Sequence, residues 1–192
     1  MTGADPSNGY DAIAAAYIEA RSDAGSAIVE DWAAQFPKGA RVLDLGCGHG
    51  VPNMPLLLGA DLTVSAIDAS PGLLAELQAR FPQVETACEP AEQSSFFGQQ
   101  FDGILAVGLM FLLPATEQLR LIQNVSDALK PGGRFLFSAP QETGTWEDLL
   151  TKRRSQSLGA KAYTARLLDV GFAEVDSVPD PGASHFYRAR KA

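Results

Sequence analysis

The sequence contains few of the residues that build metal sites and disulfide frameworks. Among its 192 residues are two cysteines, Cys47 and Cys88, and two histidines, His49 and His185. The cysteines lie far apart and form no CxxC pair, so the sequence predicts neither a disulfide-stabilised fold nor a zinc site. We therefore expect no bound metal and a reducing compartment.

Basic residues and long apolar runs are also scarce. Lys and Arg total 15 against 23 Asp and Glu, which gives a net charge of −8 at pH 7. An acidic surface repels phosphate backbones and anionic lipids, so nucleic-acid and membrane partners are not expected. The sequence shows neither an apolar run long enough for a membrane span nor the pattern of a signal peptide. These absences predict a cytoplasmic protein.

The sequence does contain ample apolar residues for a core, 46% of a chain that has the length of one domain. We expect a single domain over residues 1–192, divided into a helical cap at 1–36, a cofactor-binding core at 40–139 and a C-terminal helix and hairpin at 140–192. Residues 1–9 are polar and turn-prone, which predicts a loose terminus. Two helices are expected from residue 11 to about 36, with a break near residues 22–25.

Apolar runs and helical patterns alternate through the middle of the sequence. Runs typical of buried strands cover residues 41–45, 62–67, 84–88, 101–107 and 134–139. Helices are predicted at 52–58, from Pro71 to about residue 81, and along a segment with Leu119, Ile122, Val125 and Leu129 that ends at 131–133. Such alternation implies a mainly parallel sheet covered on both faces.

The last third of the sequence has a different pattern. A helix is predicted at 160–170, and two strands, 172–178 and 184–190, flank a turn at 179–182. Strands joined by so short a turn are antiparallel. The predicted fold is therefore α/β, a doubly wound, seven-stranded, mostly parallel sheet with an antiparallel C-terminal hairpin strand and helices on both faces.

The strongest motif is VLDLGCGHG at residues 42–50, between a predicted strand and a predicted helix. Glycines at this point let the backbone turn sharply and approach a ligand, and doubly wound sheets bind ligands here. The spacing is GxGxG, with Val51 where the dinucleotide pattern GxGxxG has its third small residue. The charge of Asp44, just before the glycines, would oppose a pyrophosphate and favour a cationic ligand.

Asp68 is the second mark of a ligand site. It ends the second predicted strand and is followed by a helix that Ser70 caps. A carboxylate in this place can accept hydrogen bonds from both hydroxyls of a ribose. Because NAD-binding proteins use the same device, Asp68 indicates a nucleoside without identifying which one.

In this combination the motifs resemble the class I (Rossmann-like) S-adenosylmethionine-dependent methyltransferases of the small-molecule type, over roughly residues 10–190. The matching segments are VLDLGCGHG at 42–50, VSAIDAS at 64–70, FDGILAVGLMFLLP at 101–114, LKPGGRFLFSAP at 129–140 and LLDVGFAEV at 167–175. The resemblance implies S-adenosylmethionine as the cofactor and methyl transfer to a small-molecule acceptor as the activity.

The resemblance also implies which residues bind the cofactor. Asp44 and the glycine loop would meet its methionine end, Asp68 its ribose, and Val107 its sulfonium. An N-terminal helix often closes over the cofactor in relatives, and Tyr10 is a further candidate for this role. The full set of implied cofactor-binding residues is Tyr17, Arg21, Asp44, Gly46, Cys47, Gly48, Asp68, Ala69, Ser70, Ala91, Glu92, Val107 and Met110.

Two segments depart from the family pattern. Pro90 stands where many relatives have an aspartate that receives the adenine amino group, so this bond must come from Glu92, from the backbone or from water. After the fourth strand, relatives often carry a histidine pair, whereas this sequence has Phe111-Leu112-Leu113. These differences remove an obvious histidine base.

No residue is predicted to be catalytic, because methyl transfer needs a general base only when the acceptor is protonated. His49 is interpreted as a packing residue of the glycine loop, and His185 as a structural hydrogen-bonding residue. Cys47 is expected to pack beside the cofactor. Tyr17 fits a cofactor cap and an anchor for the first helix equally well.

Two further features have alternative interpretations. Trp146 and Phe111 fit core packing or an apolar substrate wall, and Lys152-Arg153-Arg154 fits a solvated charged face or an attraction for anions. Segment 140–158, where relatives often insert a substrate lid, is short and favours a fairly open site. The alternatives to a small-molecule methyltransferase are a non-catalytic S-adenosylmethionine-binding or regulatory protein, a macromolecular methyltransferase, and a nicotinamide oxidoreductase, which Asp44 and Val51 oppose.

Overall fold

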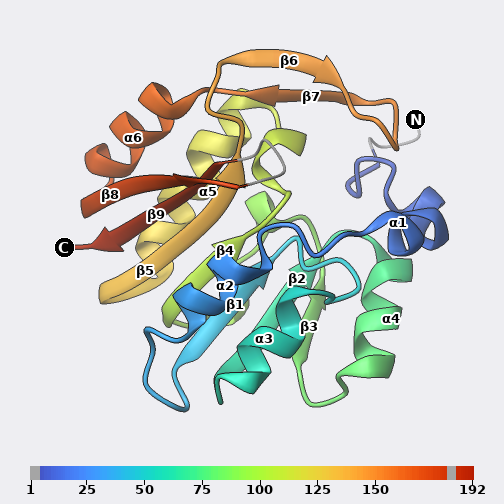
Figure 1. Ribbon diagram of the computed structural model, residues 1–192, viewed down its shortest axis with the longest axis horizontal. Coiled ribbons are helices and arrows are strands. Elements are labelled where there is room, and N and C mark those ends of the chain that lie inside the picture. Colours follow the sequence, from blue (N-terminus) through green and yellow to red (C-terminus); the bar gives the residue numbers. More distant parts are fainter. Residues whose placement is uncertain (1–4, 181–184) are drawn as a thin grey trace.

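The fold is a seven-stranded sheet with helices on both faces. The computed structural model describes residues 5–180 and 185–192. The strands of the sheet are β1 (Arg41–Leu45), β2 (Thr63–Asp68), β3 (Glu85–Cys88), β4 (Phe101–Ala106), β5 (Leu129–Ala139), β8 (Phe172–Pro179) and β9 (His185–Lys191). Their order is β3-β2-β1-β4-β5-β9-β8, with β1 to β5 parallel and β9 antiparallel to both of its neighbours (Figure 1). The predicted fold class is confirmed.

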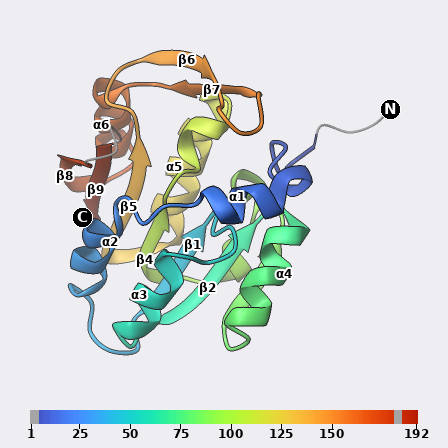
Figure 2. The same ribbon diagram turned by 45° about the vertical axis from the view of Figure 1, so that its right-hand side comes forward.

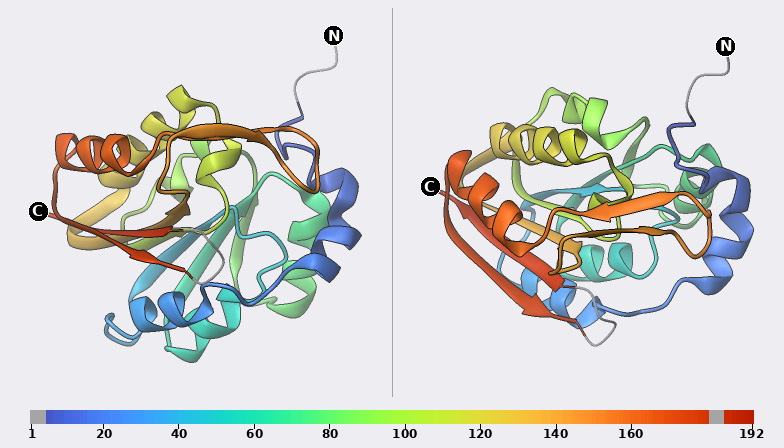
Figure 3. Two further views of the ribbon diagram at one scale, coloured as in Figure 1. Left: turned by 45° about the horizontal axis from the view of Figure 1, so that its top comes forward. Right: turned by 90° about the horizontal axis from the view of Figure 1, so that it is seen from above.

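The helices form two layers, one on each face of the sheet (Figure 3). One layer contains α2 (Ser26–Ala33), α3 (Asn53–Gly59) and α4 (Pro71–Arg80), and the other contains α5 (Ala115–Ala128) and α6 (Ala160–Asp169). Each layer has its own buried apolar cluster, and Trp32 of α2 and Tyr163 of α6 are the largest side chains in them. No helix in the described part of the chain has both the length and the apolarity to span a membrane.

The strand order reverses at β1. The chain runs outward from β1 through β2 to β3 and then crosses back to β4, on the other side of β1. Such a reversal leaves a crevice at the carboxyl ends of the adjacent strands β1 and β4. After Arg41 every residue of β1 is buried, as the apolar run predicts, so this strand fixes the base of the crevice.

The N-terminal helical region crosses the top of α4. It consists of η1 (Asp11–Ile13) and α1 (Ala14–Ala20), separated from α2 near the predicted break. A carboxylate oxygen of Asp11 accepts hydrogen bonds of 2.8 Å from the Ser70 hydroxyl and from the Gly72 amide, at the first turn of α4. These bonds hold η1 and α1 beside α4, an arrangement that Figure 2 shows.

The boundary between α5 and β5 differs from the prediction. The apolar periodicity predicts a helix that includes Leu129 and ends at 131–133, but α5 ends at Ala128 and Leu129 begins β5, paired with Phe101. Proline disfavours the helical backbone conformation in the residue that precedes it, and here Lys130 precedes Pro131. Leu129 is buried in either arrangement, which is why the periodicity misassigned it.

Residues 140–158 contain a hairpin that the sequence analysis does not predict. Strands β6 (Gly144–Glu147) and β7 (Arg154–Ser157) pair antiparallel and form a separate two-stranded sheet. This hairpin, which we call the arm, lies across the top of Figure 1 and reaches toward the N-terminal region. Its strand residues are mostly polar, so they lack the apolar alternation by which a strand is recognised.

The C-terminal elements match their predicted positions. The helix expected at 160–170 is α6, and the strands expected at 172–178 and 184–190 are β8 and β9. Part of the turn expected at 179–182, and residue 184, lie outside the described residues. The division of the chain into residues 1–36, 40–139 and 140–192 stays a prediction.

Candidate functional site

The glycine loop after β1 forms one wall of a pocket. Gly46 and Gly48 have φ angles of +68° and +56°, which side chains rarely adopt. A Cβ on Gly46 would lie 3.1 Å from Leu109, and one on Gly48 would lie 3.3 Å from the ring of Tyr17. The loop therefore needs glycine for its backbone geometry and for the close approach of its neighbours.

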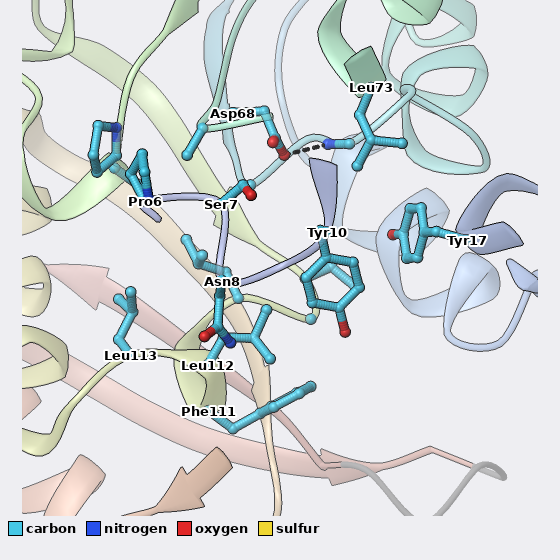
Figure 4. A pocket seen from close by; sticks show the side chains of 18 of the residues that line it. Pro6, Ser7, Asn8, Tyr10, Tyr17, Asp68, Leu73, Phe111, Leu112 and Leu113 are labelled. Atoms are coloured by element: carbon cyan, nitrogen blue, oxygen red, sulfur yellow. Dashed lines mark hydrogen bonds between the residues drawn. The ribbon is translucent and has the colours of Figure 1, made fainter. Parts of the chain in front are cut away.

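Asp68 is held against this loop by the backbone. One carboxylate oxygen accepts a 2.8 Å hydrogen bond from the Gly48 amide, drawn in Figure 4, and the other accepts one of 2.8 Å from the Ser70 amide. Burial raises the pKa of Asp68, and the backbone donors oppose that rise. Each carboxylate oxygen has a further lone pair available, so Asp68 can still accept bonds from a ligand.

Asp44 is a buried carboxylate without a partner. Its side chain lies near the end of β1, is 1% exposed, and neither oxygen has a hydrogen-bond partner among the described residues. Burial raises the pKa of Asp44 to about 8; the nearby Asp68 adds to the rise and Arg21 opposes it. A buried carboxylate of this kind is stabilised by a bound cation, so Asp44 indicates a positively charged ligand.

Tyr17 of α1 covers the glycine loop. Its ring lies edge-on to that of Tyr10, with centroids 5.2 Å apart, and edge-on to that of His49, with centroids 6.0 Å apart. Burial raises the pKa of Tyr17, Arg21 lowers it, and Asp68 and Asp44 add to the rise. His49 is 3% exposed and does not line the pocket, which agrees with a packing role.

The N-terminal turn also lines the pocket, which corrects the expectation that residues 1–9 form a loose terminus. The carboxylate of Asp5 accepts hydrogen bonds from the amide and hydroxyl of Ser7 and from the amide of Gly9. Such side-chain-to-backbone bonds close a compact turn. Its residues Pro6, Ser7, Asn8 and Tyr10 face the pocket; residues 1–4 lie outside the described chain.

The arm meets this turn at two points. Arg153 forms an ion pair of 3.0 Å with Asp5, and the hydroxyl of Tyr10 donates a 3.1 Å hydrogen bond to Asp148. No residue of segment 140–158 lines the pocket itself, so the fairly open site expected from the shortness of this segment stays a prediction. The basic run at 152–154 is exposed, as its interpretation as a solvated charged face expects, and within it Arg153 pairs with Asp5 of the N-terminal turn.

The pocket has a volume of about 200 Å³ and lies at the carboxyl ends of β1, β2 and β4 (Figure 4). The predicted cofactor-binding residues that line it are Tyr17, Arg21, Gly46, Gly48, Asp68, Ala69, Ala91, Glu92 and Val107. Four others do not reach its surface: Asp44, Cys47, Ser70 and Met110. Met110 is fully buried in the core, and the fully buried Ser70 caps α4 by accepting a bond from the Leu73 amide.

Further lining residues were missed by sequence reasoning. They lie in the N-terminal turn, in the first turn of α4 and in the segment from β4 to α5, which contains η4 (Met110–Leu112). The residues without a predicted role are Pro6, Ser7, Asn8, Leu73, Gly108, Leu109, Leu112 and Leu113. A turn-prone terminus and an apolar loop each have commoner structural explanations, so neither pattern indicated a ligand.

Of the remaining candidates, His185 and Trp146 lie outside the pocket lining and Phe111 belongs to it. His185 begins β9 opposite Ala139, and its Nδ1 is buried without a partner in the described residues, so the expected structural hydrogen bond is not made by this atom. Trp146 packs against Phe111, with ring centroids 5.8 Å apart, and Phe111 lines the pocket. The described residues contain no group of three or more His, Cys, Asp or Glu side chains arranged to hold a metal ion.

Comparison with known proteins identifies the domain. A family model described as a methyltransferase domain matches residues 42–133. A ubiquinone biosynthesis O-methyltransferase of Coxiella burnetii is 31% identical over 107 residues, which are 53% of this chain and 44% of that protein. An aklanonic acid methyltransferase of a Streptomyces species is 28% identical over 109 residues, 53% of this chain and 49% of that protein. The chain spans about half the length of these curated relatives.

Solved structures share the whole fold. An amino pentose methyltransferase of Micromonospora echinaspora has a TM-score of 0.71 at 19% identity, covering 93% of this chain and 95% of the other. A 1,6-didemethyltoxoflavin-N1-methyltransferase of Burkholderia thailandensis has a TM-score of 0.67 at 21% identity, covering 94% and 87%. The chain thus contains a methyltransferase domain at residues 42–133 and has the class I (Rossmann-like) methyltransferase fold of these structures.

Proposed function

We propose that the protein transfers the methyl group of S-adenosylmethionine to a small-molecule acceptor. The observation that carries the proposal is the unpartnered carboxylate of Asp44, buried behind the glycine loop and within electrostatic reach of Asp68 and Arg21. A dinucleotide would bring a pyrophosphate to this loop, and a second negative charge there would be unfavourable. The cationic ammonium and sulfonium of S-adenosylmethionine suit it.

The pocket residues fit the other parts of this cofactor. Asp68 has free lone pairs for ribose hydroxyls beside the glycine loop. Ala91 and Glu92 belong to η2 (Ala91–Gln93), and together with Pro90 they line the side of the pocket where the adenine edge would lie. Val107 follows β4 and lines the pocket where the sulfonium would lie. Tyr17, which covers the glycine loop, closes the site and excludes water.

When bound, S-adenosylmethionine supplies a methyl carbon to which the acceptor's lone pair bonds as the carbon–sulfur bond breaks and its electron pair stays on sulfur. The protein's part is to hold the cofactor and acceptor in line, and orientation of this kind is worth up to about 7–11 kcal/mol. Tyr10 and Tyr17 restrict the space above the glycine loop. The described pocket lining includes no histidine, and the carboxylates that line it are those of Asp68 and Glu92.

The small volume of the pocket, about 200 Å³, supports a small acceptor. Its walls include the N-terminal turn, which the arm contacts through Asp148 and Arg153. The acidic composition gives no support to a nucleic-acid substrate. The free cysteines and the absence of a spanning helix among the described residues support a cytoplasmic location.

Calorimetric titration with S-adenosylmethionine, S-adenosylhomocysteine and NAD tests the proposal. We expect both methionine-derived ligands to bind and NAD to bind far more weakly. Asp68→Asn should weaken binding, whereas Asp61→Asn, in the turn that precedes the other end of β2 and paired with exposed Lys38, should not. Binding followed by methyl transfer to a panel of small acceptors would support the enzyme. Preference for NAD, or no binding of either methionine-derived ligand, would overturn the proposal.

A further inference from the structure

The pocket wall changes character from one end to the other. The charged side chains that line it, Arg21, Asp68 and Glu92, belong to the elements assigned above to the cofactor. The segment after β4 contributes an apolar wall, made by Leu109, Phe111, Leu112 and Leu113. Figure 4 shows Asp68 at one side of the pocket and Phe111, Leu112 and Leu113 at the other.

Two aromatic rings stand at this apolar end. Tyr10 comes from the N-terminal turn and Phe111 from η4, so the segments that carry them are about a hundred residues apart in the sequence. Both line the pocket, and Figure 4 shows their rings on neighbouring sides of it. Each ring has a different aromatic neighbour: Tyr17 for Tyr10, and Trp146 of the arm for Phe111.

Among the polar groups beside these rings, the hydroxyl of Tyr10 is engaged, whereas the side-chain nitrogen of Asn8, which also lines the pocket, has no partner among the described residues. The hydroxyl of Tyr10 donates to Asp148, and that carboxylate also accepts bonds from the Leu150 amide and from the amide and hydroxyl of Thr151. Asp148 is 8% exposed. Tyr10 is therefore held by its hydroxyl and presents its ring, and the apolar end offers a charged acceptor no counter-ion of its own.

We propose, building on the methyltransferase function above, that the acceptor is an uncharged compound with a flat aromatic ring, which binds between Tyr10 and Phe111. Aromatic rings attract one another in stacked and edge-on arrangements, and a flat ring fits between two such walls. A charged acceptor would lose its hydration at the leucine wall and gain no ion pair in return. Trp146 supports Phe111 from the arm and so acts as a positioning residue for this subsite.

Three probes of one size test the charge requirement. 2-Naphthol is neutral, 2-naphthoate is anionic and 2-(aminomethyl)naphthalene is cationic at pH 7, and their dissociation constants can be measured by ligand-observed NMR with and without S-adenosylhomocysteine. We expect 2-naphthol to bind at least about tenfold more tightly than either charged probe. The saturated analogue 2-decalol should also bind more weakly, because it is not flat. The proposal would be overturned if 2-naphthoate, 2-(aminomethyl)naphthalene or 2-decalol bound as tightly as 2-naphthol or more tightly, or if 2-naphthol did not bind.

Two matched variants locate the subsite. Phe111→Leu should weaken 2-naphthol about 5- to 10-fold, the value of one aromatic pair, while S-adenosylhomocysteine binding is unchanged. Phe36→Leu is the control, because Phe36 forms a similar pair with Trp32, at 4.7 Å, in the helix layer that contains α2. Trp146→Leu should weaken 2-naphthol less than Phe111→Leu does. Equal effects of the Phe111 and Phe36 substitutions would place the binding elsewhere.

The two proposals fail separately in this experiment. Loss of the cofactor assignment would appear as absent S-adenosylhomocysteine binding, while 2-naphthol would still show its preference for the apolar end. Loss of the acceptor assignment would appear as normal S-adenosylhomocysteine binding with no preference for the neutral flat probe.

Discussion

The hydroxyl of Tyr10 lies 3.1 Å from a carboxylate oxygen of Asp148, a residue 138 positions further along the chain. This bond and the Asp5–Arg153 ion pair join the N-terminal turn to the tip of the arm. Each segment also packs an aromatic ring, Trp146 on Phe111 and Tyr10 on Tyr17. The two polar contacts that join the segments can be tested by single substitutions.

Tyr10→Phe should loosen the N-terminal turn and leave the sheet intact. The substitution removes the bond to Asp148, a loss of about 0.5–1.5 kcal/mol in a local opening reaction. Hydrogen exchange of residues 5–17 should accelerate several-fold, while exchange in β1 and β4 should not change. Tyr187→Phe, which removes a 3.4 Å bond to the Pro140 carbonyl, is the control. Unchanged exchange in residues 5–17 would show that the bond does not hold the turn.

The stability of the ligand-free protein should fall as the pH rises through neutrality. The pKa of Asp44 is raised to about 8 in the folded state, against 3.8 as its ordinary value. Between these two pH values the folded protein holds a proton on Asp44 that the unfolded chain has released. The contribution of this proton to the free energy of unfolding is therefore complete below about pH 4 and is lost as the pH approaches 8. The expected slope is up to about 1.4 kcal/mol per pH unit, from urea unfolding.

Asp44→Asn provides the comparison for this pH dependence. The variant cannot ionise at this position, so its stability should depend less on pH between 5 and 8. S-adenosylmethionine should also release a proton from Asp44 on binding at pH 7, visible by calorimetry in buffers of different ionisation enthalpy, and the variant should lose this release. If the two proteins have the same slope and proton release, then Asp44 is already ionised in the free protein.

Gly48→Ala should disturb the pocket more than Gly39→Ala. Both glycines have positive φ angles, so alanine strains the backbone at each, by roughly 1–2 kcal/mol. A Cβ at Gly48 would also press against the ring of Tyr17, whereas one at Gly39 meets nothing within 4 Å. Calorimetry should show weaker S-adenosylhomocysteine binding only for Gly48→Ala. Equal losses in both variants would mean that backbone strain alone matters.

Gln118→Leu should destabilise the protein through the arm. Gln118 is fully buried; its amide donates to the carbonyls of Leu113 and Gln156, and its oxygen accepts a 2.6 Å bond from Tyr163. Leucine would remove these bonds and leave the Tyr163 hydroxyl without its acceptor, at a cost of about 1–3 kcal/mol where water cannot replace the bond, while the Leu113 carbonyl keeps a bond from the Gln156 side-chain amide. Urea unfolding should show the loss. Gln123→Leu, which affects the more exposed partners Asp127 and Arg166, should cost far less.

The central part of the fold could be predicted because the sequence signals that specify it lie within a few residues of the structure they determine. The buried run of β1, the glycines after it and the Ser70 cap of α4 each specify structure within a few residues, and the prediction there agrees with the structure. The boundary at Leu129 was wrong because a buried leucine satisfies a helix and a strand equally. A proline two residues later decided between them.

The junction between the N-terminal turn and the arm could not be predicted because its contacts join distant segments. Asp5 and Arg153 are ordinary surface residues in the sequence, and only the folded sheet brings them together. The strands of the arm are polar on both faces, so periodicity gives no signal for them. In the candidate site, the residues of the glycine loop and of β2 could be named in advance, whereas the N-terminal turn and the leucines after β4 could not.

The link between Asp5 and Arg153 also sets an order of events during synthesis. The two residues are separated by 148 positions, and at about 5–20 residues per second a ribosome needs roughly 7–30 s to pass from one to the other. During that interval the sheet strands up to β5 emerge, but the N-terminal turn has no partner to hold it. A nascent chain therefore exposes β1, β2 and β4, whose ends carry the glycine loop, Asp68 and Val107, before Arg153 leaves the ribosome and can pair with Asp5.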